Sequence, residues 1–413
     1  MRHVAIVGAS LAGVHAAEAL RERGFEGEIT LVDREASLPY DKPPLSKNAL
    51  LDDGVDAELP LRPRAWYDEH QIGLRLGQGV VGLDTAARTL HLNGGDAVGY
   101  DGLVLATGSA ARPLPVPCGD PSRIHRLRTL EDARRLRADL LPGRHLVVVG
   151  GGFIGLEVAA TARRLGLDVT VVETAATLLN RAFGPQVGGW IRQVHERNGV
   201  EIRCAVALQE ISSHGDGFTL RFAEGPTLSA DVVVGGVGAV PQTDWLEGSG
   251  VDLGNGVRCA SDLSTNVPSV VAAGDIAYWH NALFSEDMRV EHWTNAVEQG
   301  RHAAGTLLGD REAHQSVPYF WTDQHDAKVR FVGRADAADD LVIEEPKPDA
   351  LVALYGRNGV LRGAVCVRTP RRLAEYREAI RNRTPWEEVA GHFAGGRSTS
   401  TREPGSGPAV QEV

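Results

Sequence analysis

The sequence has 413 residues, of which 54 are acidic and 43 basic, and a formal charge of −11. Its length and its 43% hydrophobic content allow about three globular domains with ordinary cores. The acidic balance argues against a general nucleic-acid binder, whose affinity depends on neutralising phosphates. The longest apolar stretch, residues 146–160, contains Glu157 and several glycines, so the sequence predicts no membrane span.

The cysteines and histidines show no metal-binding pattern. The four cysteines lie far apart and include no C-x-x-C pair, so they predict neither a zinc site nor a local redox dithiol. The fourteen histidines show no ligand spacing, and we predict no metal site. A strand-like run from Arg2 to Val7 leaves no room for a signal peptide, so we expect a cytoplasmic protein with reduced thiols.

The chain opens with a strand, a glycine-rich turn, a helix and a second strand. The first strand is Val4–Val7, a helical run extends to Gly24, and the second strand, Ile29–Val32, ends at Asp33. The turn reads Gly8-Ala9-Ser10-Leu11-Ala12-Gly13. This order is typical of a dinucleotide-binding unit, in which the helix N-terminus faces a pyrophosphate and an acid accepts from ribose hydroxyls. Ser10 replaces the usual middle glycine, so its Cβ crowds the pyrophosphate while its hydroxyl can bond to it.

A second unit of the same kind lies about 140 residues further on. It has a strand (Leu146–Val149), a helix to about Leu165, and a strand (Val169–Val172) that ends at Glu173. Its turn keeps all the expected glycines in Gly150-Gly151-Gly152-Phe153-Ile154-Gly155. The carboxylate of Glu173 would repel a 2′-phosphate, which favours NADH over NADPH, although Arg181 downstream would act in the opposite sense.

Two dinucleotide-binding units in one chain imply two dinucleotides. A tightly held FAD beside an exchangeable nicotinamide is the pairing with an obvious chemistry, in which the cofactors react and the protein sets geometry and electrostatics. The predicted fold class is α/β, with two Rossmann-like domains and a C-terminal α+β domain. The alternative is a plain doubly wound fold whose small residues serve packing alone.

Further motifs, in order along the chain, resemble the FAD-dependent NADH:ferredoxin reductases of bacterial monooxygenase and dioxygenase systems. The resemblance covers residues 2 to about 393 and rests on segments 39–47, 106–108, 127–133, 273–275, 291–300 and 317–324. It implies a glutathione-reductase-like fold, FAD and NAD as cofactors, and a small iron–sulfur ferredoxin (2Fe-2S or 3Fe-4S/4Fe-4S) as partner. We expect no nucleic-acid or membrane partner, and a monomer or weak homodimer.

The resemblance also implies contacts to the cofactors. It places Asp33 on the adenosine ribose of FAD, Val80 near the adenine, and Asp275 on the ribityl chain. The alternative for Asp275 is an N-cap of the turn that follows. Phe153 and Ile154 are expected beside the nicotinamide. The remaining implied contacts are Gly8, Ser10, Leu11, Ala12, Gly13, Arg34, Lys42, Ala106, Thr107, Gly108, Arg128, Gly150, Gly152, Gly155, Glu173, Gly238 and Gly274.

Lys47 and Glu157 are the residues to which the resemblance assigns the chemistry. The matching lysine lies near flavin N5 and pairs with a glutamate on the helix of the nicotinamide unit. A compact ammonium there would favour the reduced, anionic flavin. Glu157 lies in an otherwise apolar helix, where an unpaired carboxylate is costly, so pairing with Lys47 would explain it. The alternatives are a surface lysine after a Pro-Pro turn and a solvated carboxylate at a helix start.

The later motifs are expected to complete the flavin pocket. A helix over residues 293–308 should begin at the flavin, with its N-terminal dipole beside the pyrimidine edge. Trp293 and Trp321 are implied as walls of the isoalloxazine pocket, or else are ordinary core residues. Lys42 is expected at a phosphate or at the flavin. A run of arginines forms either a solvated helix face or a basic docking surface for an acidic ferredoxin, and comprises Arg371, Arg372, Arg377, Arg381 and Arg383.

The expected FAD-binding domain is discontinuous, 1–108 plus 235–315, because Gly236–Pro241 marks the return of the chain. The NAD-binding domain is 109–234. The C-terminal domain, 316–395, is predicted to have helices near 371–382 and 386–391, preceded by strands at Lys328–Val332, Leu351–Tyr355 and Leu361–Val367. Residues 396–413, rich in Gly, Ser, Thr and Pro, are predicted to be disordered.

The leading functional hypothesis is an enzyme of the ferredoxin–NAD(+) reductase class, which passes electrons from NADH through FAD to a ferredoxin. A competing hypothesis, a flavin disulfide reductase or NADH peroxidase, needs a cysteine close to the flavin, and no cysteine precedes Cys118. An NADH oxidase or rubredoxin reductase is a second competitor. A nucleotide-bound interaction protein that resembles apoptosis-inducing factor is a third.

Overall fold

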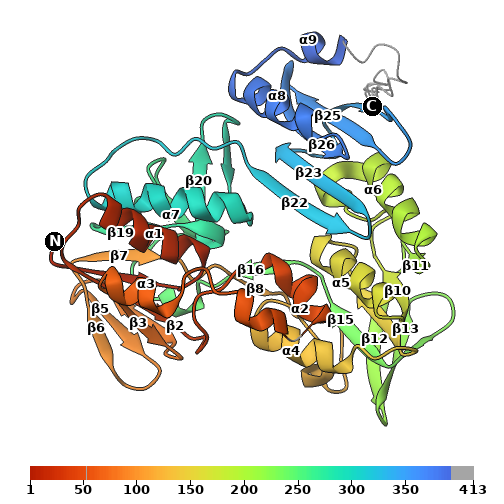
Figure 1. Ribbon diagram of the computed structural model, residues 1–413, viewed down its shortest axis with the longest axis horizontal. Coiled ribbons are helices and arrows are strands. Elements are labelled where there is room, and N and C mark those ends of the chain that lie inside the picture. Colours follow the sequence, from red (N-terminus) through yellow and green to blue (C-terminus); the bar gives the residue numbers. More distant parts are fainter. Residues whose placement is uncertain (53, 392–413) are drawn as a thin grey trace, which may run out of the picture.

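The computed structural model describes residues 1–52 and 54–391 (Figure 1). The predicted disordered tail, 396–413, lies outside the described residues, as do the last positions of the expected C-terminal domain, 392–395. The chain forms two parallel-sheet regions, and a C-terminal antiparallel sheet packs beside the second of them (Figure 1).

The first parallel sheet comes mostly from the start of the chain. Its strands run in the order β19 (Val270–Ala272), β7 (Gly102–Leu105), β1 (His3–Val7), β2 (Glu28–Asp33) and β3 (Ile72–Leu76). Val4 and Ile6 of β1 pack toward α1 (Leu11–Glu22) and α7 (Trp293–Leu307), whereas Ala5 and Val7 join the core on the other face. A strand that is apolar at consecutive positions is typical of a parallel sheet covered on both faces.

The second parallel sheet repeats this arrangement. Its strands run in the order β11 (Val200–Arg203), β10 (Asp168–Val172), β9 (His145–Val149) and β15 (Val232–Gly235). α5 (Phe153–Arg164) connects β9 to β10, and α6 (Asn180–Arg197), which is kinked at Gly184, connects β10 to β11. The two predicted strand–turn–helix–strand units are therefore confirmed, with strand ends within one residue of the predicted ones.

Shorter elements link and cover the two parallel sheets. β8 (Ser109–Ala111) and β16 (Ala239–Pro241) pair where the chain crosses between them. Helices α2 (Asn48–Leu51), α3 (Arg64–Glu69) and α4 (Leu130–Asp139) and the 3₁₀ turn η1 (Pro43–Ser46) lie in the connections. Three small sheets are formed by β4 (Val80–Asp84), β5 (Thr89–Leu92) and β6 (Ala97–Gly99); by β12 (Leu208–His214), β13 (Gly217–Phe222) and β14 (Leu228–Ala230); and by β17 (Leu253–Gly254), β18 (Gly256–Cys259), β20 (Ala277–Asn281) and β21 (Glu286–Met288).

The C-terminal segment forms an antiparallel sheet in the order β22 (Tyr319–Gln324), β23 (Ala327–Gly333), β26 (Val360–Val367), β25 (Leu351–Arg357) and β24 (Asp340–Glu344). Helices α8 (Pro370–Arg381) and α9 (Trp386–Gly391) follow. The three predicted strands and both helices are present. β22 and β24 were not predicted, because each is an edge strand with little burial and therefore with weak alternation in its sequence.

Packing joins parts that are distant in sequence. One buried cluster contains residues of the segment 40–59, of both strands and helices of the second parallel-sheet region, and of the C-terminal sheet. The segment before Lys47 and the strand β22 thus both pack against the region that contains α5. Within residues 1–52 and 54–391, no helix is long and apolar enough to cross a membrane.

Candidate active site

The ends of the parallel strands bring the glycine-rich turns together with distant segments. The register pairs Val7 with Val32 and with Leu105, so the first turn lies beside Asp33 and the segment after β7. A Cβ on Gly8 would lie 2.2 Å from the carbonyl oxygen of Ala106, and Gly8 has a φ of 104°. A glycine is therefore required where these two chain segments cross.

The second unit has the same construction. Val149 pairs with Val172 and with Gly235, and a Cβ on Gly150 would lie 2.5 Å from the carbonyl oxygen of Gly236. Ligands of open parallel sheets bind at the carboxyl ends of the strands. Both turns, at the start of α1 and of α5, thus have the geometry of a dinucleotide cradle.

The acids at the ends of β2 and β10 hold these turns by one hydrogen-bonding pattern. Asp33 accepts from the backbone N–H of Ala9 at 2.6 Å and of Glu35 at 2.8 Å. Glu173 accepts from Gly151 N–H at 2.6 Å and from Ala175 N–H at 2.7 Å. Two backbone donors therefore hold each carboxylate in one orientation, at the position where a ribose hydroxyl would donate.

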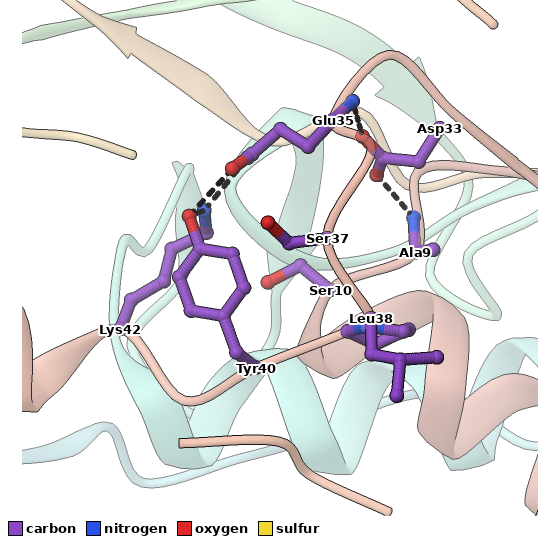
Figure 2. Close-up of a pocket in the computed structure, with 9 residues that line it drawn as sticks. Ala9, Ser10, Asp33, Glu35, Ser37, Leu38, Tyr40 and Lys42 are labelled. Carbon is purple, nitrogen blue, oxygen red and sulfur yellow. Dashed lines mark hydrogen bonds and ion pairs between the residues drawn. The ribbon is translucent and has the colours of Figure 1, made fainter. Parts of the chain in front are cut away.

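A pocket lies between the first turn and the segment that follows β2 (Figure 2). Ser10 lines it and is the N-cap of α1, but its side chain makes no capping hydrogen bond. The hydroxyl of Ser10 is thus not used by the helix, which fits the predicted bond to a pyrophosphate. The lining residues are Ala9, Ser10, Asp33, Glu35, Ser37, Leu38, Pro39, Tyr40 and Lys42.

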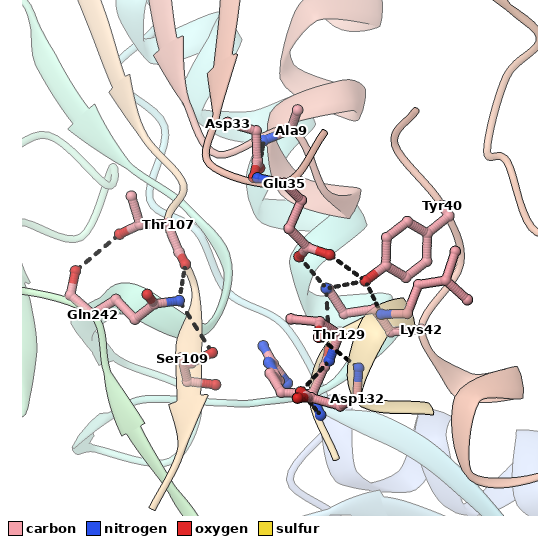
Figure 3. Close-up of polar contacts among 12 residues, drawn as sticks. Ala9, Asp33, Glu35, Tyr40, Lys42, Thr107, Ser109, Thr129, Asp132 and Gln242 are labelled. Atoms are coloured by element: carbon pink, nitrogen blue, oxygen red, sulfur yellow. Dashed lines mark hydrogen bonds and ion pairs between the residues drawn. The ribbon is translucent and has the colours of Figure 1, made fainter. Parts of the chain in front are cut away.

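Lys42 is held at this pocket by an acid that sequence reasoning missed. Its ammonium lies 3.2 Å from Glu35 Oε1, 3.4 Å from the hydroxyl of Tyr40 and 3.4 Å from the carbonyl oxygen of Arg128 (Figure 3). Tyr40 donates to Glu35 at 2.6 Å and accepts from Leu130 N–H at 2.8 Å. Burial lowers the pKa of Lys42 and, together with Glu35, raises the pKa of Tyr40. The residues of the expected FAD segment are thereby tied to the chain that leads into α4.

Asp275 lies in the 3₁₀ turn η5 (Gly274–Ile276) and does not cap it, because the N-cap is Ala273. The N-cap interpretation of Asp275 is therefore wrong. Its Oδ2 accepts from Arg128 Nη2 at 2.8 Å and from the Ser109 hydroxyl at 2.9 Å. Three segments meet at this carboxylate, one after β19, one at the start of β8 and one just before α4.

The crossing between the two units is fixed by Gln242, which was also not predicted. The side chain of Gln242 donates to the carbonyl oxygens of Thr107 at 2.9 Å and Ser109 at 3.3 Å, and the Thr107 hydroxyl donates back to the carbonyl oxygen of Gln242 (Figure 3). Gly108 lies between these residues with a φ of 68°. A glutamine after a Val-Pro strand carries no local signal of this role, since the contact spans the chain.

Lys47 and Glu157 form the predicted pair. The Lys47 ammonium lies 2.7 Å from Glu157 Oε2, and the same oxygen accepts from the Ser46 hydroxyl at 2.5 Å. Glu157 Oε1 accepts from the Thr322 hydroxyl at 2.7 Å. The carboxylate is only 7% exposed, so the solvated interpretation of Glu157 is wrong, as is that of a free surface lysine. Two segments of the chain, residues 46–47 and strand β22, supply its donors.

The two predicted tryptophans lie together, one at the start of α7 and one in β22. The rings of Trp293 and Trp321 are 6.0 Å apart at 60°, and Trp293 donates to Asp41 Oδ1 at 2.7 Å. Both rings are partly exposed, so neither is an ordinary core residue. Phe153 at the start of α5 packs edge-on against Phe320, 4.7 Å away. Because successive residues of a strand point to opposite faces, the Phe153–Phe320 pair and the Trp293–Trp321 pair lie on opposite faces of β22.

The start of α7 adds polar groups next to Trp293. Its N-cap residue, His292, makes no capping hydrogen bond, so the N–H groups of the first turn are not paired by that side chain. Burial lowers the pKa of the His292 ring to about 4, which keeps it neutral. Gln299 accepts from Gly274 N–H at 2.8 Å and holds η5 against α7. The helix dipole at this end favours a negatively charged group.

The remaining predicted contact residues are spread over several elements. Val80 is in the small sheet of β4, Arg34 is exposed after β2, and Ile154 is 44% exposed at the start of α5. Gly238, with a φ of 101°, follows the second crossing. Leu11, Ala12 and Gly13 form the first turn of α1; in α5, Gly155 takes the place of Gly13, and Gly152 is the N-cap, as Ser10 is in α1. These positions suit the two ends of extended dinucleotides.

The arginine run is largely paired with acids. Arg372 lies 2.6 Å from Glu344, Arg377 lies 3.1 Å from Glu298, and Arg381 pairs with Glu378 within its own helix. This compensation favours the solvated helix face over a basic docking surface.

The comparisons with known proteins agree with this geometry. The family model described as "Pyridine nucleotide-disulphide oxidoreductase" matches residues 2–300, and one described as "Reductase C-terminal" matches residues 319–392. The chain therefore belongs to the pyridine nucleotide-disulphide oxidoreductases.

Individual relatives narrow this class. The chain is 38% identical over 354 residues to the ferredoxin–NAD(+) reductase component of an anthranilate 1,2-dioxygenase system from Burkholderia cepacia, covering 86% of this chain and 87% of that one. It is 36% identical to rhodocoxin reductase from Rhodococcus erythropolis, covering 92% and 90%. The solved structure of a covalent putidaredoxin reductase–putidaredoxin complex matches with a TM-score of 0.88, 34% identity, and 93% and 94% coverage. The predicted family and fold class are confirmed.

Reductases of this type use FAD and NAD(H), which confirms the predicted cofactors. The residues present fit both groups. In each unit a glycine lies where two chain segments cross, and an acid follows the second strand. The hydroxyl of Ser10, which makes no capping hydrogen bond, is left for a phosphate.

Proposed function

We propose that this chain oxidises NADH with bound FAD and delivers the electrons to a small iron–sulfur ferredoxin that serves a bacterial oxygenase. When bound, the nicotinamide supplies a hydride, and the flavin accepts two electrons and releases them one at a time. The observation that carries the proposal is the ion pair between Lys47 and Glu157. It joins the two dinucleotide units at the point where their cofactors would have to meet.

The residues divide between two sites under this proposal. Residues 1–108 and 235–315 hold FAD, with Asp33 on the adenosine ribose and Asp275 toward the ribityl chain. Residues 109–234 hold NAD, with Glu173 on its adenosine ribose. The C-terminal segment from 316 closes the flavin pocket with Trp321. Support comes from the register that aligns strand ends in each sheet and from the contacts of each acid.

Lys47 acts as the charged group beside the reactive part of the flavin. Its ammonium is compact and held within hydrogen-bonding distance of Glu157, so it presents a fixed positive charge. Glu157 orients Lys47 rather than moving a proton. The uncapped N-terminus of α7 adds a second positive potential for the reduced flavin.

The partner is proposed from the named relatives. One of these is the ferredoxin–NAD(+) reductase component of a dioxygenase system, another is a rhodocoxin reductase, and the structural relative is a complex of putidaredoxin reductase with putidaredoxin. We propose a ferredoxin of the 2Fe-2S or the 3Fe-4S/4Fe-4S type, a monomer or weak homodimer, and a cytoplasmic location.

A disulfide reductase is the main alternative within the same fold. That activity needs a cysteine close to the flavin, and no cysteine precedes Cys118 in the sequence. All four cysteines, Cys118, Cys204, Cys259 and Cys366, lie within the described residues and are unpaired. Burial raises the pKa of each thiol, most strongly for Cys259, to about 12, so the thiolate form is disfavoured.

Steady-state NADH oxidation with a panel of purified ferredoxins, coupled to cytochrome c, tests the proposal. At least one ferredoxin should raise the rate of cytochrome c reduction well above the rate without carrier, while NADPH should support much less. If no ferredoxin raises the rate above the oxygen background, the proposed function is wrong. Rapid NADH oxidation that depends on an added disulfide substrate would instead favour a disulfide reductase.

A further inference from the structure

A buried chain of polar side chains extends from Glu157 away from Lys47. The Thr322 hydroxyl of β22 contacts Glu157 Oε1 at 2.7 Å, and Gln324 Nε2 lies 3.2 Å from Thr322 Oγ1. Gln324 Oε1 lies 2.9 Å from His195 Nε2 of α6. Thr322, Gln324 and His195 are each at most 1% exposed. Buried polar groups in such numbers are costly unless every one is paired.

The direction of each hydrogen bond in this chain is fixed by its neighbours. Gln324 Nε2 can only donate, so the single proton of the Thr322 hydroxyl is left for Glu157. Gln324 Oε1 can only accept, so His195 carries its proton on Nε2. Its Nδ1 then accepts from His325, 3.3 Å away. Burial lowers the pKa of His195 to about 4, which agrees with a neutral ring.

All donors therefore point toward the carboxylate of Glu157. Ser46 and Lys47 occupy Oε2, and Thr322 occupies Oε1, so both oxygens have partners and the side chain has one orientation. The amide of Gln324 interrupts any transfer of a proton along the chain, because an amide does not readily give up its N–H. The arrangement fixes geometry and charge.

We propose that Thr322, itself held by Gln324 and His195, is a positioning residue for hydride transfer, because its hydroxyl sets the orientation of Glu157 and thereby the position of the Lys47 ammonium. The inference rests on the proposed role of Lys47 beside the flavin. It assigns a part in the reaction to Thr322 of β22 and, through Gln324, to His195 of helix α6, none of which the sequence predicted as a site residue.

Thr322→Val tests this proposal, because valine keeps the shape and removes the hydroxyl. The FAD-loaded variant should show about 10-fold slower reduction of its flavin by NADH in single-turnover stopped flow, with the dissociation constant for NAD(+) within about twofold. Its flavin absorption spectrum and midpoint potential, measured without NADH, should also differ from those of the wild type. Thr322→Ser should restore all of these values, and Gln324→Leu should give an intermediate loss.

Thr306→Val is the matched control. Thr306 is 3% exposed and donates to the Asp262 carbonyl oxygen at 2.6 Å, at the end of α7 remote from the network. It should leave the reduction rate and the spectrum unchanged. Wild-type reduction rate, spectrum and potential in Thr322→Val would overturn the proposal, as would an equal loss in Thr306→Val. If Thr322→Val does not fold, wild-type values in Gln324→Leu overturn it.

The two proposals fail in different ways. If no ferredoxin accepts electrons, the proposed acceptor is wrong, but reduction of the flavin by NADH still measures the effect of Thr322. If NADH does not reduce the wild-type flavin, the proposed function is wrong, and the absorption spectrum and midpoint potential of the variants decide the role of Thr322 alone.

Discussion

Replacement of Glu173 by glutamine should change the choice between NADH and NADPH. Glu173 ends β10 and accepts from Gly151 N–H and Ala175 N–H, which fixes its carboxylate at the edge of the second turn. A 2′-phosphate bound there would lie close to this fixed negative charge. Glutamine keeps the length of the side chain and removes the charge.

The magnitude follows from Coulomb's law. At about 5 Å and an effective dielectric constant of about 40–80, one pair of unit charges repels by roughly 0.8–1.7 kcal/mol. A phosphate with a charge near −2 is then repelled by about 2–3 kcal/mol. Loss of this repulsion corresponds to about a 30- to 150-fold gain in kcat/KM for NADPH. Glutamine retains one acceptor, so NADH should lose less than about tenfold.

The assay compares kcat/KM for NADH and NADPH with a saturating electron acceptor. Glu201→Gln is the matched control, because Glu201 on the neighbouring strand β11 pairs with Arg203 at 2.8 Å and is remote from the turn. The ratio of NADPH to NADH should rise in Glu173→Gln alone. An unchanged ratio would refute the placement of a ribose at Glu173, and an equal change in Glu201→Gln would show a general effect of surface charge.

Three further outcomes are expected. Lys47→Met should slow flavin reduction by NADH about 100-fold in stopped flow, and Lys47→Arg less, because it keeps the charge; equal rates in all three proteins would contradict a role for the ammonium. In Gly8→Ala the new Cβ would lie 2.2 Å from a carbonyl oxygen, on a residue with a φ of 104°. This variant should lose on the order of 3 kcal/mol of folding free energy, and the Tm of the FAD-loaded protein should fall. Gly94→Ala, whose Cβ meets open space, should keep its Tm, and equal Tm values in the two variants would count against the crossing at Gly8. Burial lowers the pKa of His314 to about 3, so below about pH 6.5 the unfolded state takes up this proton before the folded state does. The folding stability that is present above that pH is therefore lost as the pH falls, by at most ~1.4 kcal/mol per pH unit. His314→Leu should therefore flatten the fall in Tm between about pH 7 and 5, and an equally steep fall would show that different groups cause it.

Features that repeat locally in the sequence could be predicted. Each unit places strand, glycine turn, helix and acid within about 30 residues, so spacing alone indicates both the element and the ligand. Lys47 and Glu157 could be paired in advance only through the resemblance to a family. The two residues are 110 positions apart in the sequence, and their contact depends on how the two units pack.

Residues whose role depends on tertiary packing could not be predicted. Glu35 lies near Lys42 in sequence, and the spacing of seven residues was the available signal, but acids near lysines are common at surfaces. Gln242, Thr322 and His195 reach partners more than 120 residues away, through contacts that no periodicity records. Edge strands β22 and β24 were missed for a related reason, since their faces are set by neighbours in the sheet.

The two dinucleotide units share a frame, and one of the differences between them lies at the fifth position of the helix. His15 lies two residues after Gly13, as Glu157 lies two residues after Gly155. In α1 the side chain at this position contacts its own helix, since His15 Nδ1 lies 2.9 Å from Glu18 Oε2. In α5 it crosses to the other unit and meets Lys47. If Lys47 acts on the flavin as proposed, the charge that acts between the two cofactors depends on this difference between the units.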